Sequence, residues 1–347
     1  MGNMTTIKDI AKEAGVSFTT VSNVIHGNTK KVSKATIEKI NRIMEEKNYV
    51  PNMGARMLVQ NQSRIIGVIS NVLSDAQKEN LHSPFGAEIL GAIEKEIQKL
   101  GYYMMLYATE NTEEIEELIS KWNVDGIITI GIETKVCRKL GKITKVPAVY
   151  TDCYFEEKEP YFNVGTKDEE GAYGAVRYLI GQGHTKIGYV ADESYEEGKK
   201  DSGVGYFRYQ GYLRAMKEAG IEPQKEWLFW GHKRMRNKEE MFEHIYRNLN
   251  SMTALAFCYD YYAIEAMDFL RHKGVKIPED ISVIGFDDID MARLVTPRLT
   301  TMKQGVARKG QLAVEVLMNQ IQKKKMEKKC VRLPVALVER ESVKQLK

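Results

Sequence analysis

Long hydrophobic runs are missing from this sequence. None of its apolar stretches approaches the ~18 residues that a helix needs to span a membrane. The start, MGNMTTIKDIAKEAG, also lacks the basic segment followed by an apolar segment that marks a secretory signal. We therefore expect a cytoplasmic protein with no membrane-bound part.

Cysteine is scarce, and the spacing of its residues does not indicate a metal site. The four residues, Cys137, Cys153, Cys258 and Cys330, lie far apart and form no CxxC pair. Such spacing is typical of separate buried thiols in a reducing compartment. The six His residues also lack the spacing of metal ligands. We expect neither disulfides nor a metal site.

The sequence motifs of common enzyme classes are absent as well. No GxGxxG follows the first predicted strand, and neither GxxxxGK[ST] nor GxSxG occurs. GQGHTKIG follows a predicted helix and precedes a strand, which is the reverse of the order in a phosphate-binding loop. We predict that the protein is not an enzyme and needs no cofactor.

Positive charge is unevenly distributed along the chain. Residues 1–63 hold nine Lys and Arg against five Asp and Glu, whereas the remaining residues hold 42 of each kind. All the excess charge therefore lies at the N-terminal end. A small basic module on a neutral body is typical of a domain that binds nucleic-acid phosphates.

Three short helices are predicted within this basic segment. Apolar residues recur at helical spacing over residues 6–14, and Gly15 supplies a turn. Ser17 is a suitable N-cap for a second helix, and a third is expected over residues 33–48. Three helices with tight turns predict a helix-turn-helix module whose second helix enters the major groove.

The outward face of the second predicted helix carries few charges. Phe18, Thr19, Ser22, Asn23 and His26 lie mainly opposite its apolar stripe. These side chains are of a size to meet base edges. An ordinary exposed helix face has the same composition, so the neighbouring segments decide between the two interpretations.

The segment YVPNMGARMLVQNQSR follows the third helix. Pro51 ends that helix, and Asn52 can cap a further short helix that includes Arg56 and Leu58. About eight residues are too few for a stable isolated helix, so this one needs a support such as DNA. Leu58 beside Arg56 resembles an apolar wedge that opens a base step in the minor groove. The alternative is an ordinary linker.

From Arg64 onward, strands and helices alternate. This alternation predicts an α/β fold with doubly wound parallel sheets in two lobes, and a ligand site at the carboxyl ends of the strands, between the lobes. We expect a headpiece over residues 1–50, a hinge over 51–63 and a core over 64–347. The predicted lobes are residues 64–165 with 293–325, and residues 166–292 with 326–347.

The chain resembles the lac repressor/galactose repressor (LacI/GalR) family of transcriptional regulators along its whole length. The resemblance rests on several ordered motifs: TIKDIAKEAGVSFTTVSNVIHG, YVPNMGARML, YLIGQGHTKIGYV, RYQGYLRAM and IPEDISVIGFDDIDMARLVTPRLTTMKQ. It implies a periplasmic-binding-protein-like core that forms a homodimer, so that two headpieces bind two half-sites of a double-stranded operator. ARML takes the position of the family's hinge wedge, which favours a DNA contact for Leu58.

The resemblance also assigns roles to individual headpiece residues. Phe18, Thr19 and Asn23 are expected at base edges. Phe18 replaces a residue that is often polar, so we expect it to meet a thymine methyl group or a sugar. The expected phosphate contacts, which position the protein without reading sequence, are Lys8, Ser17, Thr20, Ser22, His26 and Asn28. Asn52, Arg56 and Leu58 complete the predicted DNA-binding residues.

The predicted effector-binding residues lie at strand ends of the core. Asp260 and Asp287 each end a predicted strand, where a carboxylate can accept hydrogen bonds from a ligand or cap a helix. Arg208 matches a family position that reaches the effector. The other candidates are Phe85, Asp152 and Tyr259.

The sequence favours a sugar or sugar derivative as effector, with a sugar phosphate or a nucleobase-like molecule as alternatives. Thr166 and Lys167 replace the pair Asp-Asn that is typical of the family, so one familiar ligand contact is missing. The basic loop WGHKRMRNKEE favours an anionic effector or is simply solvated surface. Whether the effector releases or promotes DNA binding stays open. The alternative function is a cytosolic small-molecule-binding protein whose headpiece binds DNA without sequence preference.

Overall fold

A computed structural model describes residues 5–25, 29–49, 62–70, 83–191, 203–231, 238–326 and 328–346. The chain forms two compact units, Met1–Ser63 and Arg64–Lys347. The division falls where the predicted hinge meets the predicted core.

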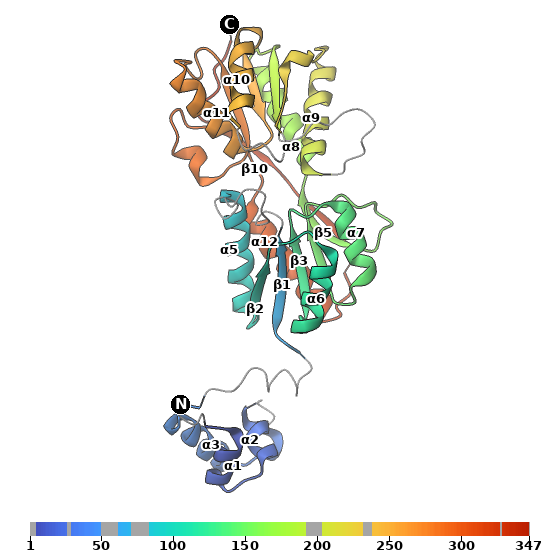
Figure 1. The fold of residues 1–347 in the computed structure, drawn as a ribbon, viewed down its shortest axis with the longest axis vertical. Coiled ribbons are helices and arrows are strands. Elements are labelled where there is room, and N and C mark those ends of the chain that lie inside the picture. The colour runs from blue at the N-terminus through green and yellow to red at the C-terminus, as the bar shows by residue number, and fades with distance from the viewer. Residues whose placement is uncertain are drawn as a thin grey trace. The chain divides into compact units, whose positions relative to one another are not determined.

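Among its described residues, the N-terminal unit forms three α-helices (Figure 1). Its elements are α1 (Ile7–Ala14), α2 (Phe18–Ile25), the 3₁₀ turn η1 (Thr29–Lys31) and α3 (Lys34–Glu46). Thr6 and Asp9 form a capping box at the start of α1, and Gly15 ends it with a φ of 68°, in the left-handed region that favours glycine. Ser33 caps α3 as predicted.

A small apolar core holds the three helices together. Its centre is Ile10, Val21 and Ile40, one residue from each helix, and all three are fully buried. The remaining buried members are Ala11, Ala14, Val24 and Ile43. The predicted helix-turn-helix arrangement is therefore confirmed.

The first lobe of the core is built on a six-stranded parallel sheet with the order β11-β5-β4-β3-β1-β2. Its strands are β1 (Ile65–Ser70), β2 (Tyr103–Tyr107), β3 (Gly126–Ile130), β4 (Ala148–Thr151), β5 (Phe162–Thr166) and β11 (Cys330–Leu333). Its helices are α5 (Pro84–Lys99), α6 (Thr112–Trp122), α7 (Thr134–Ile143) and α12 (Val306–Ile321). Every residue of β1 is buried because helices cover both faces of the sheet.

The second lobe has a sheet with the order β12-β10-β9-β8-β6-β7, in which β12 alone is antiparallel to its neighbour. Its strands are β6 (Ile187–Ala191), β7 (Leu228–Trp230), β8 (Ala254–Phe257), β9 (Ser282–Asp287), β10 (Thr300–Lys303) and β12 (Ala336–Val338). Its helices are α8 (Asp168–Gly181), α9 (Val204–Glu218), α10 (Glu239–Asn248) and α11 (Asp260–His272). The short 3₁₀ turns are η3 (Lys225–Trp227), η4 (Leu249–Ser251) and η5 (Asp290–Arg293).

The chain crosses between the lobes three times, after β5, after β10 and after β11 (Figure 1). The predicted lobe boundaries at residues 293 and 326 are therefore wrong for two strands. β10 belongs to the second sheet, where it lies between β9 and β12, and β11 belongs to the first sheet, where it extends β5. Within the part of the chain that the structure describes, no helix combines the length and apolar character that a membrane span requires.

The separate headpiece core leads to the first prediction. Ile40→Ala should destabilise the headpiece by about 2–5 kcal/mol, because truncation leaves a cavity among the helices. Differential scanning calorimetry of the whole chain should show an earlier headpiece transition and an unchanged core transition. The matched variant is Ile93→Ala, at a fully buried position of the first lobe, and it should shift only the core transition. A common shift of both transitions would contradict independent units.

Candidate nucleic-acid interface and effector site

The predicted base-contacting residues lie on α2. Phe18 is 51% exposed, an unusual position for a large apolar ring, and Thr19 is also exposed. Asn23 is half-buried. An exposed phenyl ring next to hydroxyl and amide groups offers a surface that can contact both a thymine methyl and base edges.

The predicted phosphate contacts surround this helix. Lys8 on α1 and Ser17 before α2 are exposed, while Thr20 and Ser22 are half-buried. Ser17 also caps α2, because its Oγ accepts a hydrogen bond at 3.1 Å from the N–H of Thr20. The predictions for His26, Asn28, Asn52, Arg56 and Leu58 lie outside the described residues.

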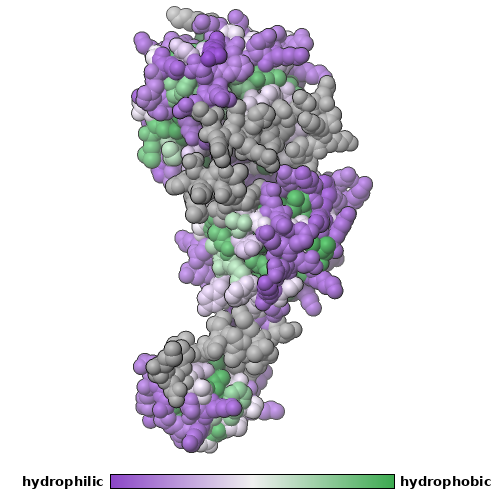
Figure 2. All heavy atoms as spheres, viewed as in Figure 1, coloured by the Kyte–Doolittle hydropathy of each residue, from purple (hydrophilic) through white to green (hydrophobic). Residues whose placement is uncertain are grey.

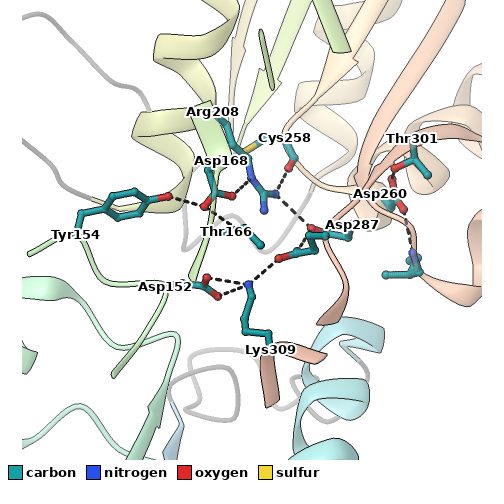
Figure 3. Close-up of polar contacts among 12 residues, drawn as sticks. Asp152, Tyr154, Thr166, Asp168, Arg208, Cys258, Asp260, Asp287, Thr301 and Lys309 are labelled. Atoms are coloured by element: carbon teal, nitrogen blue, oxygen red, sulfur yellow. Dashed lines mark hydrogen bonds and ion pairs between the residues drawn. The ribbon is translucent and has the colours of Figure 1, made fainter. Parts of the chain in front are cut away.

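In the core, Arg208 lies at the centre of a buried polar network (Figure 3). It projects from α9 and is 2% exposed. Its Nε donates to Asp168 at 2.9 Å, and its Nη1 donates to the carbonyl oxygen of Cys258 at 2.5 Å and to Asp287 at 3.3 Å. The guanidinium also lies 3.6 Å from the ring centroid of Phe286. Two carboxylates and a ring thus hold this cation in place.

A second buried cation, Lys309 of α12, continues the network. Its Nζ donates to both oxygens of Asp152, at 2.7 and 2.8 Å, and to Gln304 Oε1 at 2.6 Å. The side-chain amide of Gln304 donates in turn to Asp287 at 2.5 Å. Asp152 and Lys309 belong to the first lobe and Asp287 to the second, so this path of hydrogen bonds links the lobes (Figure 3).

Tyr154 makes another link between the lobes. Its ring stacks on Phe207 of α9, with centroids 3.8 Å apart and planes 17° apart, and its hydroxyl donates to Asp168. Asp168 also accepts from Thr166 at 2.9 Å. A single carboxylate at the first crossing therefore receives hydrogen bonds from the loop after β4, from β5 and from α9.

Of the predicted effector residues, Arg208, Asp152 and Asp287 belong to the network, and Phe85 and Tyr259 lie against it. Asp152 and Asp287 have φ angles of 54° and 132°, which non-glycine residues adopt rarely and which are often found at functional sites. Phe85 lies near the network, since its ring centroid is 5.3 Å from Nζ of Lys309. Burial raises the pKa of Asp287 to about 6, although the charges of Arg208 and Lys309 lower it.

Tyr259 and Asp260 lie beside the network. The ring centroid of Tyr259 is 5.2 Å from the guanidinium carbon of Arg208. Asp260 is fully buried, and its carboxylate accepts hydrogen bonds from the backbone of Ile289 at 3.1 Å and from Thr301 at 2.5 Å. These bonds fasten α11 to η5 and β10. In this conformation, Asp260 has no exposed surface with which to meet a ligand.

A depression of about 860 Å³ opens beside Asp287. It is bordered by the first turns of α5 and α12 and by the segment Asp287–Asp290. This volume suits a small ligand. Asp287 therefore lies at the boundary between the buried network and an open space.

Five side chains of the network were not among the predicted site residues: Tyr154, Thr166, Asp168, Gln304 and Lys309. Asp168 carries a detectable signal, because it follows a predicted strand in the same way as Asp152 does. Gln304 lies just before α12 and Lys309 lies within it, and no helix was predicted over this segment. No local pattern places the ammonium group of Lys309 next to Asp152, 157 residues earlier in the chain.

The fold and the two sites define a class: a DNA-binding headpiece joined to a two-lobed ligand-binding core. Residues 6–52 match the model of bacterial regulatory proteins of the lacI family, and residues 176–343 match the periplasmic binding protein-like domain. The chain belongs to the LacI family and is a DNA-binding transcriptional repressor. It is therefore a regulator and not an enzyme.

Individual relatives agree with this membership. The HTH-type transcriptional repressor PurR of Pasteurella multocida is 35% identical, and the match covers 98% of this chain and 99% of the relative. The lac repressor dimer bound to operator and the anti-inducer ONPF has a TM-score of 0.82 at 26% identity, covering 99% of this chain and 100% of that one. A LacI family regulator from Enterococcus faecium with bound ribose has a TM-score of 0.68 at 26% identity, covering 82% and 100%.

The buried carboxylate of Asp260 leads to a prediction about pH. Burial, together with the charge of Asp287, raises the pKa of Asp260 from its ordinary value of 3.8 to about 7. The folded core thus binds a proton more tightly than the unfolded chain does, so this group's contribution to stability is lost as pH rises from about 4 through 7. The variant Asp260→Asn stays uncharged. Its melting temperature relative to the unmodified protein should rise between pH 5 and pH 8.

The measurement is thermal unfolding of both proteins across this range. Asp268→Asn is the control, because that side chain is 67% exposed and belongs to the same helix. A constant difference between Asp260→Asn and the unmodified protein would show that Asp260 does not titrate in this range.

Proposed function

We propose that this repressor binds a near-palindromic operator as a homodimer and that a sugar or sugar derivative, bound between the core lobes, controls its operator affinity. The observation that carries the proposal is the polar path Arg208–Asp287–Gln304–Lys309–Asp152 between the lobes. A molecule that takes up these donors and acceptors changes how the lobes are held together. We propose that the protein acts in the cytoplasm, because it binds operator DNA there.

In the headpiece, Phe18, Thr19 and Asn23 are proposed to read base edges from the exposed side of α2. Lys8, Ser17, Thr20 and Ser22 are proposed to hold the phosphates on either side. His26, Asn28, Asn52, Arg56 and Leu58 complete the proposal from the sequence alone, with Leu58 as the minor-groove wedge. The basic excess of residues 1–63 supports non-specific attraction to DNA.

In the core, Arg208 and Asp287 are proposed to bind the effector, with Asp152 and Phe85 on the side of the first lobe and Tyr259 on the side of the second. Sugar hydroxyl groups both donate and accept, which matches a cluster that presents guanidinium, ammonium and carboxylate groups together. The related regulator from Enterococcus faecium has bound ribose, which supports a sugar-like ligand. Asp260 is proposed to position the end of β9 rather than to touch the ligand, since its oxygens are already engaged.

The mechanism that we propose couples two equilibria. The effector favours one arrangement of the lobes because it binds that arrangement more tightly. The changed lobes alter the distance between the paired hinge segments of the dimer, and with it their ability to enter the minor groove. An effector that separates the hinges acts as an inducer, and one that brings them together acts as a corepressor.

The dimer is proposed to form along α5 and the neighbouring edge strand β2. Tyr103, Leu106 and Tyr107 of β2 are 59%, 38% and 39% exposed, and Leu100 follows α5 at 44%. Figure 2 shows apolar and weakly polar residues on this side of the first lobe, between strongly hydrophilic areas. An exposed edge strand with apolar side chains is normally covered by a partner. The lac repressor, a structural relative, is itself a dimer.

The operator proposal is tested with two headpiece variants. An operator is first selected from a pool of random DNA duplexes with the unmodified protein. Asn23→Ala should reduce the preference for this operator over random DNA by about 1–3 kcal/mol, because it removes a base contact. Lys8→Ala should weaken binding to operator and to random DNA alike. The slope of log affinity against log salt concentration should become smaller in magnitude by about one. Fluorescence anisotropy over a range of salt concentrations measures both effects. If Asn23→Ala weakened binding to operator and to random DNA equally, Asn23 would be a phosphate contact instead.

The effector proposal is tested with Asp287→Asn, which keeps the size of the side chain. Operator binding should stay within about threefold of the unmodified protein, while effector affinity should fall at least about tenfold through loss of a charged acceptor. The control is Asp288→Asn, whose carboxylate pairs with Arg340 on the second lobe. Sugars are first screened by their effect on operator binding. If the effector lost its influence on operator binding equally in Asp287→Asn and Asp288→Asn, the cause would be a general disturbance of the loop after β9.

A further inference from the structure

Arg332 is a cation at the interlobe edge that neither sequence motifs nor the network in Figure 3 include. It lies on β11 opposite Gly165 of β5, in parallel register. The carboxyl ends of parallel strands meet at one edge of a sheet, so Arg332 lies near Asp152 and Tyr154, which follow β4.

Two contacts fix the guanidinium of Arg332. Its Nη2 donates to the carbonyl oxygen of Cys153 at 2.6 Å, and its carbon lies 4.1 Å from the ring centroid of Tyr154. Its Nη1 is buried and has no hydrogen-bond partner among the residues that the structure describes. Buried donors are normally satisfied, so this nitrogen requires an acceptor that the described side chains do not supply.

Nearby carboxylates are already engaged with other cations and donors. Both oxygens of Asp152 bind Lys309, and Asp168 accepts from Tyr154, Thr166 and Arg208. Within the described ranges, Arg332 forms no ion pair, whereas Arg208 and Lys309 each form at least one. Arg332 therefore has positive charge available for an incoming anion.

Gly165 provides the room that this arrangement needs. A Cβ atom at residue 165 would overlap Nη1 of Arg332, and the same point lies 3.4 Å from Oδ1 of Asp152. The absence of a side chain thus lets the guanidinium lie against β5. Arg332 and Asp152 converge over this glycine, one as a donor and the other as an acceptor.

We propose that Arg332 is a specificity-determining residue that binds an anionic group of the effector, a phosphate ester or a carboxylate on a sugar. The proposal rests on the effector site proposed above. A planar guanidinium suits either anion because it offers N–H groups in a fixed geometry. Binding of the anion satisfies Nη1, while Arg208 and Asp287 bind the hydroxyl groups of the same molecule.

The first experiment uses inorganic phosphate as the probe and the full-length protein. Phosphate, titrated against chloride at constant ionic strength, should raise the melting temperature of the core more in the unmodified protein than in Arg332→Met. Gly165→Ala should behave like Arg332→Met, because the new methyl group displaces the guanidinium but leaves its charge. The matched control is Arg138→Met in the same lobe, since Arg138 also lies over a ring, that of Phe155, but pairs with Glu159. It should respond to phosphate like the unmodified protein.

The second experiment compares sugars that differ only in the anionic group. D-glucose is compared with D-glucose 6-phosphate and D-gluconate, and D-ribose with D-ribose 5-phosphate, by calorimetric titration. The unmodified protein should prefer one anionic form by at least about tenfold, and Arg332→Met should lose that preference while keeping its affinity for the neutral sugar. Preference for the phosphate identifies a sugar phosphate, and preference for gluconate identifies a sugar acid.

Two results would overturn the inference: the same phosphate response in Arg332→Met as in the unmodified protein, or a preference for anionic sugars that survives this substitution. A phosphate response that depends on Arg332, combined with no binding of any sugar, would support an anion-binding Arg332. The sugar assignment of the proposed function would then be the part that fails.

Discussion

The structure of the core depends on one constraint: several charges are buried where its two lobes meet. Removing Arg208 and Lys309 from water is costly, and the cost is offset only by partners with good geometry. Those partners come from different parts of the fold, Asp168 from the first crossing, Asp287 from β9 and Asp152 from the loop after β4. These ion pairs lie within single lobes, and the lobes are joined through Gln304 and through the hydrogen bond from Tyr154 to Asp168, so that their separation breaks these links and exposes the buried charges to water. This requirement couples lobe movement to any ligand that offers alternative partners.

The headpiece is stabilised differently, by a small apolar core. Its helices are held by a handful of apolar residues around Ile10, Val21 and Ile40, and its functional face is left exposed. A small domain with such a limited core has little stability to spare. The exposed ring of Phe18 adds nothing to that core, which agrees with the base contact that we propose for it.

Local sequence patterns were sufficient to predict most helices and strands. They were insufficient to predict how these elements are connected in the two lobes. The apolar run of β1 and the stripe of α2 were readable because each segment is buried or amphipathic along its own length. No helix was predicted over α12, whose buried side includes the charged Lys309. β10 and β11 were placed in the wrong lobes because strand pairing depends on distant partners. Likewise, Arg208, Asp152 and Asp287 were found from strand ends and motifs, whereas Gln304 and Arg332 required tertiary contacts.

The neutral amide of Gln304 makes the interlobe path suitable for switching. Its Nε2 donates to Asp287 and its Oε1 accepts from Lys309, so a single uncharged group joins two ion pairs from different lobes. Exchanging an amide for ligand hydroxyl groups costs far less desolvation than separating a direct ion pair. Each lobe keeps its own charges paired, Lys309 with Asp152 and Arg208 with Asp168, while the connection between the lobes is released. A modest difference in ligand affinity between two lobe arrangements is then enough to shift their populations.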